Sequence, residues 1–565
     1  MKNITDRINT LMKACIFLSV LIVISYCIWT LDRGFDITDE AYYLLLSIHP
    51  HAVTFFISAA QWITSTLWQI TGSVYAFRAI GMCILLFSSL LLALGTVVAC
   101  TRCNLISVIH FGERVTIIAS TFCGALFYAA TINFSPSYNL LASAGAYAAA
   151  GLVLFTVNNS DGWRNALLCF LAGCALGIEL ICKGSSGIAT LGVVLILTVT
   201  LSCTWRDKIM NMAMTVFGLC AFIFAVILIK TTIADSLNSF NHGLMLFRLV
   251  QTETVSARLL RYFIEFSHYL FVAAVAFAIP FIAFLLYAFT RYAVFIIIGL
   301  AVLAYTLISG HYLQGGLNQY SPEAISLFVI LILGLVSSFP AWTKNRKIMV
   351  LLGGLFILPY SVAIGTGNSL FTQVIDSLAP WGALISVLAF ADSPKEYSKI
   401  PIMFINIFFV ITMSIQIMSS LLLPYHLDKP LAQKSYPVSV GNLGVIKMDA
   451  QTQLFVSDIT QAAQKCHILP GRPFLGLYNV PGVALVLQAV PPLTPWLNDE
   501  VQADMILAFM NPNILHSAVI ALKLNLDGSR PVLPKQLSAF PTGYTLCGTA
   551  TYPFHHREIQ IWVEK

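Results

Sequence analysis

Long apolar runs separated by short polar connections fill most of this chain. About thirteen of them approach the roughly 20 residues with which a helix crosses about 30 Å of hydrocarbon. We predict membrane spans at positions 12–31, 79–101, 115–132, 140–157, 165–182, 187–204, 210–230, 268–289, 293–309, 322–340, 348–364, 377–391 and 401–423. The pattern therefore predicts an all-α polytopic membrane domain over residues 1–423.

The apolar runs stop near residue 424, where the character of the sequence changes. Proline, asparagine, aspartate and glutamine become frequent, and no later run is long enough to cross a bilayer. Periodicity predicts a helix at 451–466 and strands at 472–478 and 558–563. We expect residues 424–565 to form a small α/β domain outside the membrane.

The basic residues of the short connections indicate which way the chain crosses the membrane. Arginine and lysine fall in alternate connections, which by the positive-inside rule face the cytoplasm together with the N-terminus. An odd number of spans then places the first long loop, at about 32–78, on the far side together with the 424–565 domain. The amphipathic part of that loop, with Trp62 and Trp68, is expected to lie along the membrane interface.

Composition supports a membrane protein, because 58% of the 565 residues are apolar and only 10% are charged. The net charge of +6 does not indicate a nucleic-acid partner, since the basic residues are spread over the connections. Most of the 13 cysteines lie in or beside spans, where cysteine packs as a small apolar residue. Cys466 and Cys547 are the only two in the 424–565 domain. We predict that they form a disulfide, because the compartment outside the cytoplasm is oxidising.

Four acids, Asp32, Asp36, Asp39 and Glu40, stand within nine residues directly after the first apolar run. The whole chain has only 25 acids, so this cluster requires an explanation. Acids at the rim of a membrane span are candidates for function, because burial gains nothing from them. A structural explanation is also open: Thr38 could cap a helix with Asp39 and Glu40 in its first turn, where they suit the helix dipole.

Several basic residues are predicted on the same side as the acids, against the charge rule. They are Arg78, Lys183, Arg248, Arg258 and Arg261. A carboxylate facing such cations suits group transfer from a phosphate-bearing lipid, since it can take a proton from an acceptor hydroxyl while the cations stabilise the phosphate. Two alternatives remain open: Arg78 could extend to lipid headgroups, and Lys183 could form an ion pair with Glu179, four residues earlier.

The run Thr38-Asp39-Glu40-Ala41-Tyr42-Tyr43 resembles the Asp-Glu signature of the GT-C superfamily of membrane glycosyltransferases. The similarity is greatest to the branch of the lipid A aminoarabinose transferase and the protein O-mannosyltransferases. Lys183-Gly184 resembles the Lys-Gly-Pro turn of that branch, and Arg78 resembles its Arg-Leu-Pro element. Two positions depart from the family pattern: Ser185 replaces the proline, and no basic residue precedes Tyr320.

The resemblance implies an inverting transfer of a sugar from a polyprenyl-phosphate donor to a hydroxyl of lipid A, a glycan or a protein. It places Asp39 in the catalytic acid's position with Glu40 beside it. The substrate-binding candidates are Arg78, Lys183, Tyr138, Asn139 and Tyr320. It also implies a bacterial inner membrane, a periplasmic C-terminal domain, and membrane lipids as partners. It names no certain cofactor, and a divalent metal remains open.

Two other functions fit a chain with this many spans. A lipid or polysaccharide transporter is one, but transporters gather ionisable residues near the membrane midplane and often show repeated halves. Here the ionisable residues gather at one rim, and no internal repeat is visible. An O-antigen-ligase-like enzyme is the other, although it would use a large late outer loop with arginine and histidine. The sequence identifies neither the sugar nor the acceptor.

Overall fold

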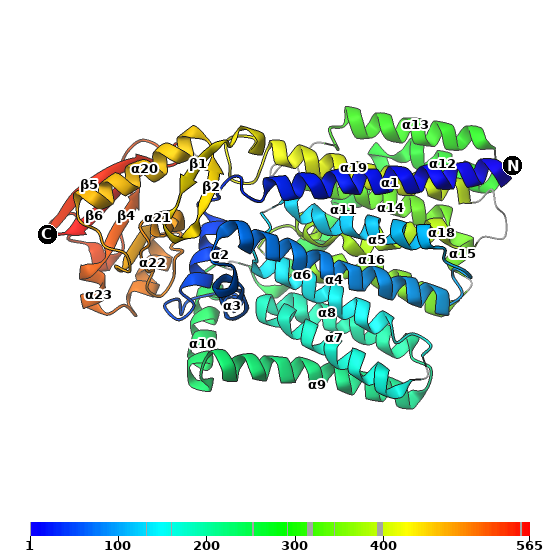
Figure 1. The fold of residues 1–565 in the computed structure, drawn as a ribbon, viewed down its shortest axis with the longest axis horizontal. Coiled ribbons are helices and arrows are strands. Elements are labelled where there is room, and N and C mark those ends of the chain that lie inside the picture. Colours follow the sequence, from blue (N-terminus) through cyan, green and yellow to red (C-terminus); the bar gives the residue numbers. More distant parts are fainter. Residues whose placement is uncertain are drawn as a thin grey trace.

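The computed structural model describes residues 2–565 except 132, 160, 251–252, 291, 314–319, 344, 366, 393–398 and 554–555. Long helices run side by side along the longest axis of the molecule, and the part that contains the strands caps one end of this bundle (Figure 1). The N-terminus lies at the opposite end, and the C-terminus lies in the cap (Figure 1).

Most helices of the bundle coincide with predicted spans. They are α1 (Lys2–Thr30), α4 (Val74–Arg102), α5 (Phe111–Leu126), α6 (Tyr138–Leu154), α7 (Gly162–Cys182), α8 (Gly184–Leu201), α9 (Trp205–Lys230), α11 (Val255–Ala276), α12 (Ala278–Thr290), α13 (Ala293–Ser309), α14 (Tyr320–Ser337), α16 (Arg346–Ala363), α18 (Ala379–Phe390) and α19 (Lys399–Leu422). Within the described residues, eight helices are long and apolar enough to cross a membrane. A pair bent by 69°, Leu370–Ser377 with Ala379–Phe390, forms a ninth candidate. The protein is therefore an integral membrane protein, and the count of thirteen spans stays a prediction.

Residues 231–267 connect the predicted spans at 210–230 and 268–289, so an outer loop is expected there, but most of the described residues of this connection are helical. It contains α10 (Ile233–Val250) and the first half of α11, and α11 is itself a candidate span. The predicted span at 268–289 is divided between α11 and α12. The charges of α11 made this segment look like a loop, but Arg261 pairs with Glu253 at 3.2 Å and with Glu265 at 3.6 Å. These local pairs offset the charge, so an otherwise apolar helix forms.

The cap contains a four-stranded sheet in the order β3-β4-β6-β5, in which only β3 and β4 are parallel. Its strands are β3 (Phe474–Leu477), β4 (Val519–Lys523), β5 (Tyr544–Thr551) and β6 (Glu558–Glu564), beside the antiparallel pair β1 (Tyr436–Ser439) and β2 (Val445–Met448). Its helices are α20 (Ala450–Lys465), α21 (Pro481–Val486), α22 (Glu500–Leu507) and α23 (Pro512–Ser517). The predicted helix at 451–466 and the strands at 472–478 and 558–563 are confirmed.

A disulfide joins Cys466, at the end of α20, to Cys547 of β5, with 5.6 Å between their α-carbons. This confirms the pairing predicted from the sequence. The bond ties the end of the helix to the sheet, and because it closes a loop between cysteines 81 residues apart it also restricts the unfolded chain.

The first outer segment joins the cap to the bundle. Its helices, α2 (Asp39–Ile48) and α3 (Gln61–Thr71), lie between the two parts (Figure 1). Phe35, Ile37 and Leu44 share one buried apolar cluster with residues of the cap. Backbone pairing continues this contact, since the Gly34 N–H donates to the Lys447 carbonyl at 2.8 Å. The core of the cap is therefore completed by the segment that carries the acids.

The acidic segment and the C-terminal domain lie at the same end of the bundle, as an odd number of spans requires. We predict that this end is outside the cytoplasm. A reporter that works only in the cytoplasm, fused after Lys565, is expected to be silent in intact cells. The same reporter fused after Lys208, in a connection predicted to be cytoplasmic, should be active. The reverse result would place the acids in the cytoplasm.

Candidate active site

Asp36 organises the start of α2. Its Oδ1 accepts hydrogen bonds from the Thr38 N–H at 2.8 Å and the Thr38 hydroxyl at 2.5 Å. Its Oδ2 accepts from the N–H groups of Asp39 at 3.2 Å and Glu40 at 3.3 Å. The capping role expected of Thr38 is thus wrong in detail: Thr38 stands at the N-cap position without a capping bond from its side chain. The Asp36 carboxylate instead satisfies the amides that a helix leaves open at its start.

Glu40 is fully buried and binds Arg78 with both carboxylate oxygens. The Arg78 Nε lies 2.7 Å from Oε1, and the Nη2 lies 2.7 Å from Oε2. Ser135 and Asn133 donate to the same carboxylate at 2.5 and 3.1 Å. A two-point contact of this kind is among the stronger charge-assisted hydrogen bonds in proteins. The pair therefore fixes α2 against α4 and against the connection before α6.

Arg78 also holds the end of the first span. Its guanidinium donates to the carbonyls of Leu31 at 2.9 Å, Arg33 at 3.2 Å and Gly34 at 2.7 Å. Only 1% of its surface is exposed. The alternative in which Arg78 extends to lipid headgroups is therefore wrong, because the chain itself supplies its partners.

Asp39 directly follows this rigid framework, and its side chain is only partly buried. Its Oδ2 accepts a hydrogen bond from the Tyr425 hydroxyl at 2.6 Å. Burial, and next the negative charge of Asp36, raise the pKa of Asp39 to about 6. At neutral pH most of the carboxyl groups are still ionised. Asp39 is thus a reachable carboxylate held on a fixed helix start.

Aromatic rings form a wall beside Asp39. Tyr43 contacts Tyr138 edge to face with 5.7 Å between ring centres. Tyr42 contacts Trp496 of the cap at 4.9 Å. Rings of this kind offer flat apolar surface at the border between membrane and water. Tyr138, which is predicted to bind substrate, therefore lies close to Asp39, which is predicted to act on that substrate.

His426 reaches the same place from the end of the last span. Its Nδ1 lies 2.8 Å from the Thr38 hydroxyl and 3.9 Å from the Asp36 Oδ2. Burial lowers the pKa of His426, but the hydrogen bonding and charge of Asp36 and the charge of Asp39 outweigh burial and leave the pKa raised. The imidazole thus adds a proton-binding group to the two carboxylates.

Asp36, Asp39 and His426 fit the requirements of a divalent cation. One ligand atom of each lies within 4.8 Å of those of the other two. Two carboxylates with an imidazole form a donor set that suits Zn²⁺ or Mn²⁺. The Asp36 Oδ2, whose two hydrogen bonds are the longer ones, lies 3.9 Å from the His426 Nδ1 and would be the oxygen offered to a cation.

The other substrate-binding candidates are Lys183, Asn139 and Tyr320. Lys183 separates α7 from α8, and its ammonium donates to the Val362 carbonyl at 2.8 Å. The Glu179 carboxylate accepts from Ser186 and Thr190, and no ion pair with Lys183 is present in the described part of the chain. Asn139 is buried in α6. Tyr320 opens α14, but its side chain lies outside the described residues.

Sequence reasoning missed Tyr425, His426, Asn133 and Ser135 as members of the site. The first two follow the last span, on the side that an odd number of crossings shares with Asp39. That placement was the one available signal, because no local spacing links residues 386 positions apart. Asn133 and Ser135 lie in a short connection where polar residues are ordinary.

The fold and the site define an integral membrane protein with an acidic centre at one end of its helix bundle. No family model and no curated protein sequence matches this chain. Among solved structures, it is similar to the crystal structure of the Archaeoglobus fulgidus oligosaccharyltransferase in complex with Zn and sulfate. The match covers 89% of this chain and 67% of that chain, at 11% sequence identity and a TM-score of 0.45.

Proposed function

We propose that this protein is a glycosyltransferase of the GT-C type that uses a polyprenyl-phosphate sugar as donor. The observation that carries the proposal is the placement of Asp39. The Asp36 cap and the Glu40–Arg78 pair fix the backbone on both sides of it, yet its own side chain stays partly exposed. A rigidly held, reachable carboxylate beside an aromatic wall suits proton transfer to or from a sugar substrate.

In the proposed reaction, Asp39 takes the proton of an acceptor hydroxyl on a lipid, a glycan or a protein. The hydroxyl oxygen forms the new bond to the anomeric carbon of the donor sugar. The bond between that carbon and the phosphate oxygen breaks, and polyprenyl phosphate leaves with the electron pair. One-step displacement inverts the anomeric centre.

Glu40 and Arg78 are positioning residues in this scheme, because their charges already satisfy each other. Asp36 and His426 would hold a divalent cation together with Asp39, and such a cation would offset the negative charge of the phosphate. We place the reaction on the outer face of a bacterial inner membrane, following the charge pattern and the family resemblance. Lys183, Tyr138, Asn139 and Tyr320 remain candidates for substrate contacts.

The test is transfer by the purified full-length protein. The protein in detergent or nanodiscs is mixed with a panel of polyprenyl-phosphate sugars and with membrane extracts as acceptors, and release of polyprenyl phosphate is followed by mass spectrometry. We expect one donor to be consumed with formation of a glycosylated product of inverted configuration. If no donor is consumed while the protein moves a lipid-linked glycan between leaflets of a vesicle, the protein is a transporter.

Metal removal gives a further prediction. We expect chelation with EDTA to lower transfer by roughly tenfold or more, and an added divalent cation to restore it, because a cation held by Asp36, Asp39 and His426 would offset the negative charge of the phosphate. Elemental analysis should find less bound metal in His426→Ala than in the wild type. His516→Ala, at an exposed histidine of the cap, is the matched control. Full transfer after chelation would show that the carboxylates work without metal.

A further inference from the structure

A second polar site lies in the cap, at one edge of its larger sheet. The parallel strands β3 and β4 both end there, and Arg557, just before the antiparallel β6, reaches the same edge. Ligands of open α/β sheets bind at the carboxyl ends of the strands. A cavity of about 400 Å³ lies at this edge, lined by Tyr478, Asn479, Asn498, Asp499, Glu500, Lys523, Asn525, Pro531, Val532 and Arg557.

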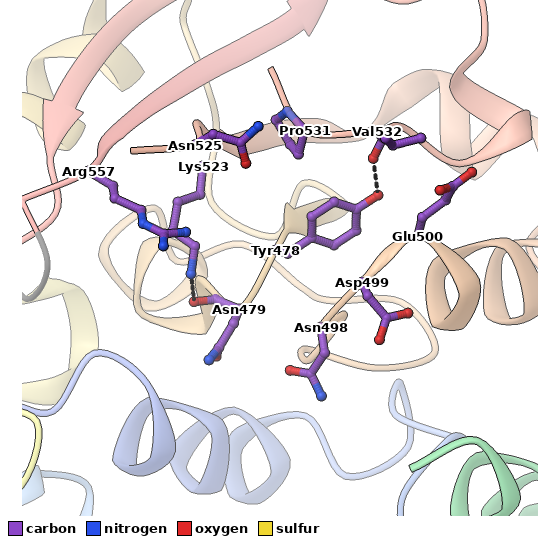
Figure 2. A pocket seen from close by; sticks show the side chains of 10 residues that line it. All are labelled: Tyr478, Asn479, Asn498, Asp499, Glu500, Lys523, Asn525, Pro531, Val532 and Arg557. Carbon is purple, nitrogen blue, oxygen red and sulfur yellow. Dashed lines mark hydrogen bonds between the residues drawn. The ribbon is translucent and has the colours of Figure 1, made fainter. Parts of the chain in front are cut away.

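The charges of this cavity are divided between its two ends. Figure 2 shows Lys523 and Arg557 side by side at one end, Asp499 and Glu500 at the other, and the Tyr478 ring between them. The Tyr478 hydroxyl donates to the Val532 carbonyl at 2.7 Å, which fixes the ring. The middle of the cavity therefore offers a flat face, with opposite charges on its two sides.

The cationic end has no acid to balance it. No ion pair of Lys523 or Arg557 occurs in the described ranges, and the Lys523 ammonium approaches only the Asn479 carbonyl, at 3.5 Å, and the Tyr552 ring, at 5.5 Å. Burial, and then the neighbouring Arg557, lower the pKa of Lys523 to about 8. Two like charges side by side without an acid cost stability.

Buried polar atoms at this end also lack partners. The Arg557 Nε–H is buried without an acceptor, and the Asn479 Oδ1 is buried without a donor, among the residues that the structure describes. Most buried polar atoms in proteins are satisfied, so each exception requires an explanation. A bound anion would accept from Arg557 and Lys523 together, while Asn479 would accept from a hydroxyl next to it.

The cavity lies next to the segment that carries Asp39. The N–H of Gly482, three residues after Asn479, donates to the Ile37 carbonyl at 2.9 Å. Asn479 and Asn498 point toward the pale blue helices of the first outer segment (Figure 2). Burial, and then the charges of Asp36 and Asp39, raise the pKa of Tyr552, whose ring faces Lys523. A molecule in the cavity would thus extend toward the carboxylate.

We infer that this cavity binds an anionic sugar of the acceptor, with its phosphate or carboxylate on Lys523 and Arg557. The sugar ring lies on Tyr478, and its hydroxyls donate to Asp499 and Glu500. The acceptor is favoured over the donor, because a polyprenyl phosphate stays at headgroup level while the cavity lies in the cap, beyond α2. The identification of this sugar as part of the acceptor rests on the proposed function. The prediction that the cavity binds an anionic sugar does not depend on that function.

Binding is measured directly on the full-length protein, in an assay that does not depend on sugar transfer. The probes are glucose 1-phosphate, glucuronic acid and neutral glucose. Each is titrated into the protein in detergent, and binding is measured by calorimetry. We expect the two anionic sugars to bind at least tenfold more tightly than glucose. Lys523→Met, which keeps the apolar stem, and Arg557→Gln should each lose that preference. Lys465→Ala, at an exposed lysine of α20, is the matched control and should bind like the wild type.

Two further measurements separate a binding role from a structural one. Lys523→Met should melt at or above the wild-type temperature, because it removes an unbalanced charge, and a lower melting temperature would overturn the inference. In the transfer assay, both variants should raise the KM for the acceptor at least tenfold and leave the donor KM unchanged. A raised donor KM instead, or equal binding of glucose and glucose 1-phosphate, would also overturn it. Anionic binding in a protein that transfers no sugar would refute the proposed function alone.

Discussion

Asp39→Asn is expected to abolish sugar transfer, by roughly 100-fold to 10,000-fold, while the protein stays folded and inserted in the membrane. Asparagine keeps the shape of the side chain and can still accept the hydrogen bond of the Tyr425 hydroxyl. It cannot take a proton from an acceptor hydroxyl. If Asp39 only supports the start of α2, asparagine would serve as well, and the loss would be small. The turnover rate at saturating donor is the measurement.

Two controls make this test specific. Asp32→Asn removes another acid of the same segment, one that pairs with the Lys447 ammonium at 2.6 Å on the surface. Exposed pairs contribute little, so its activity should stay within about twofold of the wild type. Asp36→Asn keeps one acceptor oxygen but loses the second, to which the Asp39 and Glu40 N–H groups donate. Its melting temperature is therefore measured with its activity, and a loss of transfer without a lower melting temperature would indicate metal dependence. Wild-type turnover in Asp39→Asn would falsify the catalytic assignment.

Breaking the Glu40–Arg78 pair is expected to have the largest effect on stability. Arg78→Met leaves the Glu40 carboxylate fully buried without its cation, and the usual cost of such a change is about 3–5 kcal/mol. The melting temperature in detergent should fall clearly, and transfer should fall with it as α2 loses its position. Arg206→Met, at an exposed position in the first turn of α9, is the control and should melt near the wild-type temperature.

The double variant Arg78→Met/Glu40→Gln distinguishes positioning from substrate binding. It removes both charges, so it should melt higher than Arg78→Met alone, and the two changes should not be additive. If Arg78 instead binds the donor phosphate, Arg78→Met would melt like the wild type and raise only the KM for the donor. Comparing melting temperature with donor KM therefore decides between the two roles.

The sequence allowed the parts of the structure with local patterns to be predicted. Apolar length identified most bundle helices, alternation identified β6, and the count of cysteines in one region identified the Cys466–Cys547 bond. Helices that contain charged residues paired with near neighbours were harder to predict from the sequence. The charges of Arg261, Glu253 and Glu265 made part of α11 look like a loop, and only the structure shows that they pair with one another.

The candidate site was predictable only in part, for a related reason. The acids around Asp39 were visible as an unusual cluster, but the partner of each depends on tertiary contacts. Sequence could not show that Asp36 rather than Thr38 caps α2, nor that Arg78 turns inward to Glu40. Both outcomes depend on the backbone geometry and burial of the folded chain. The local sequence alone favours the simpler alternatives, in which Thr38 caps the helix and Arg78 extends to lipid headgroups.

The hydrogen bond between Tyr425 and Asp39 has a consequence for the order of events during synthesis. A ribosome adds about 5–20 residues per second, so Tyr425 is made roughly 20–80 s after Asp39, from which 386 positions separate it. Trp496 and the sheet follow later still. A nascent chain therefore carries the Asp39 carboxylate long before its Tyr425 partner exists. The protein gains the complete candidate site only after its last helix has been inserted and its C-terminal end has folded.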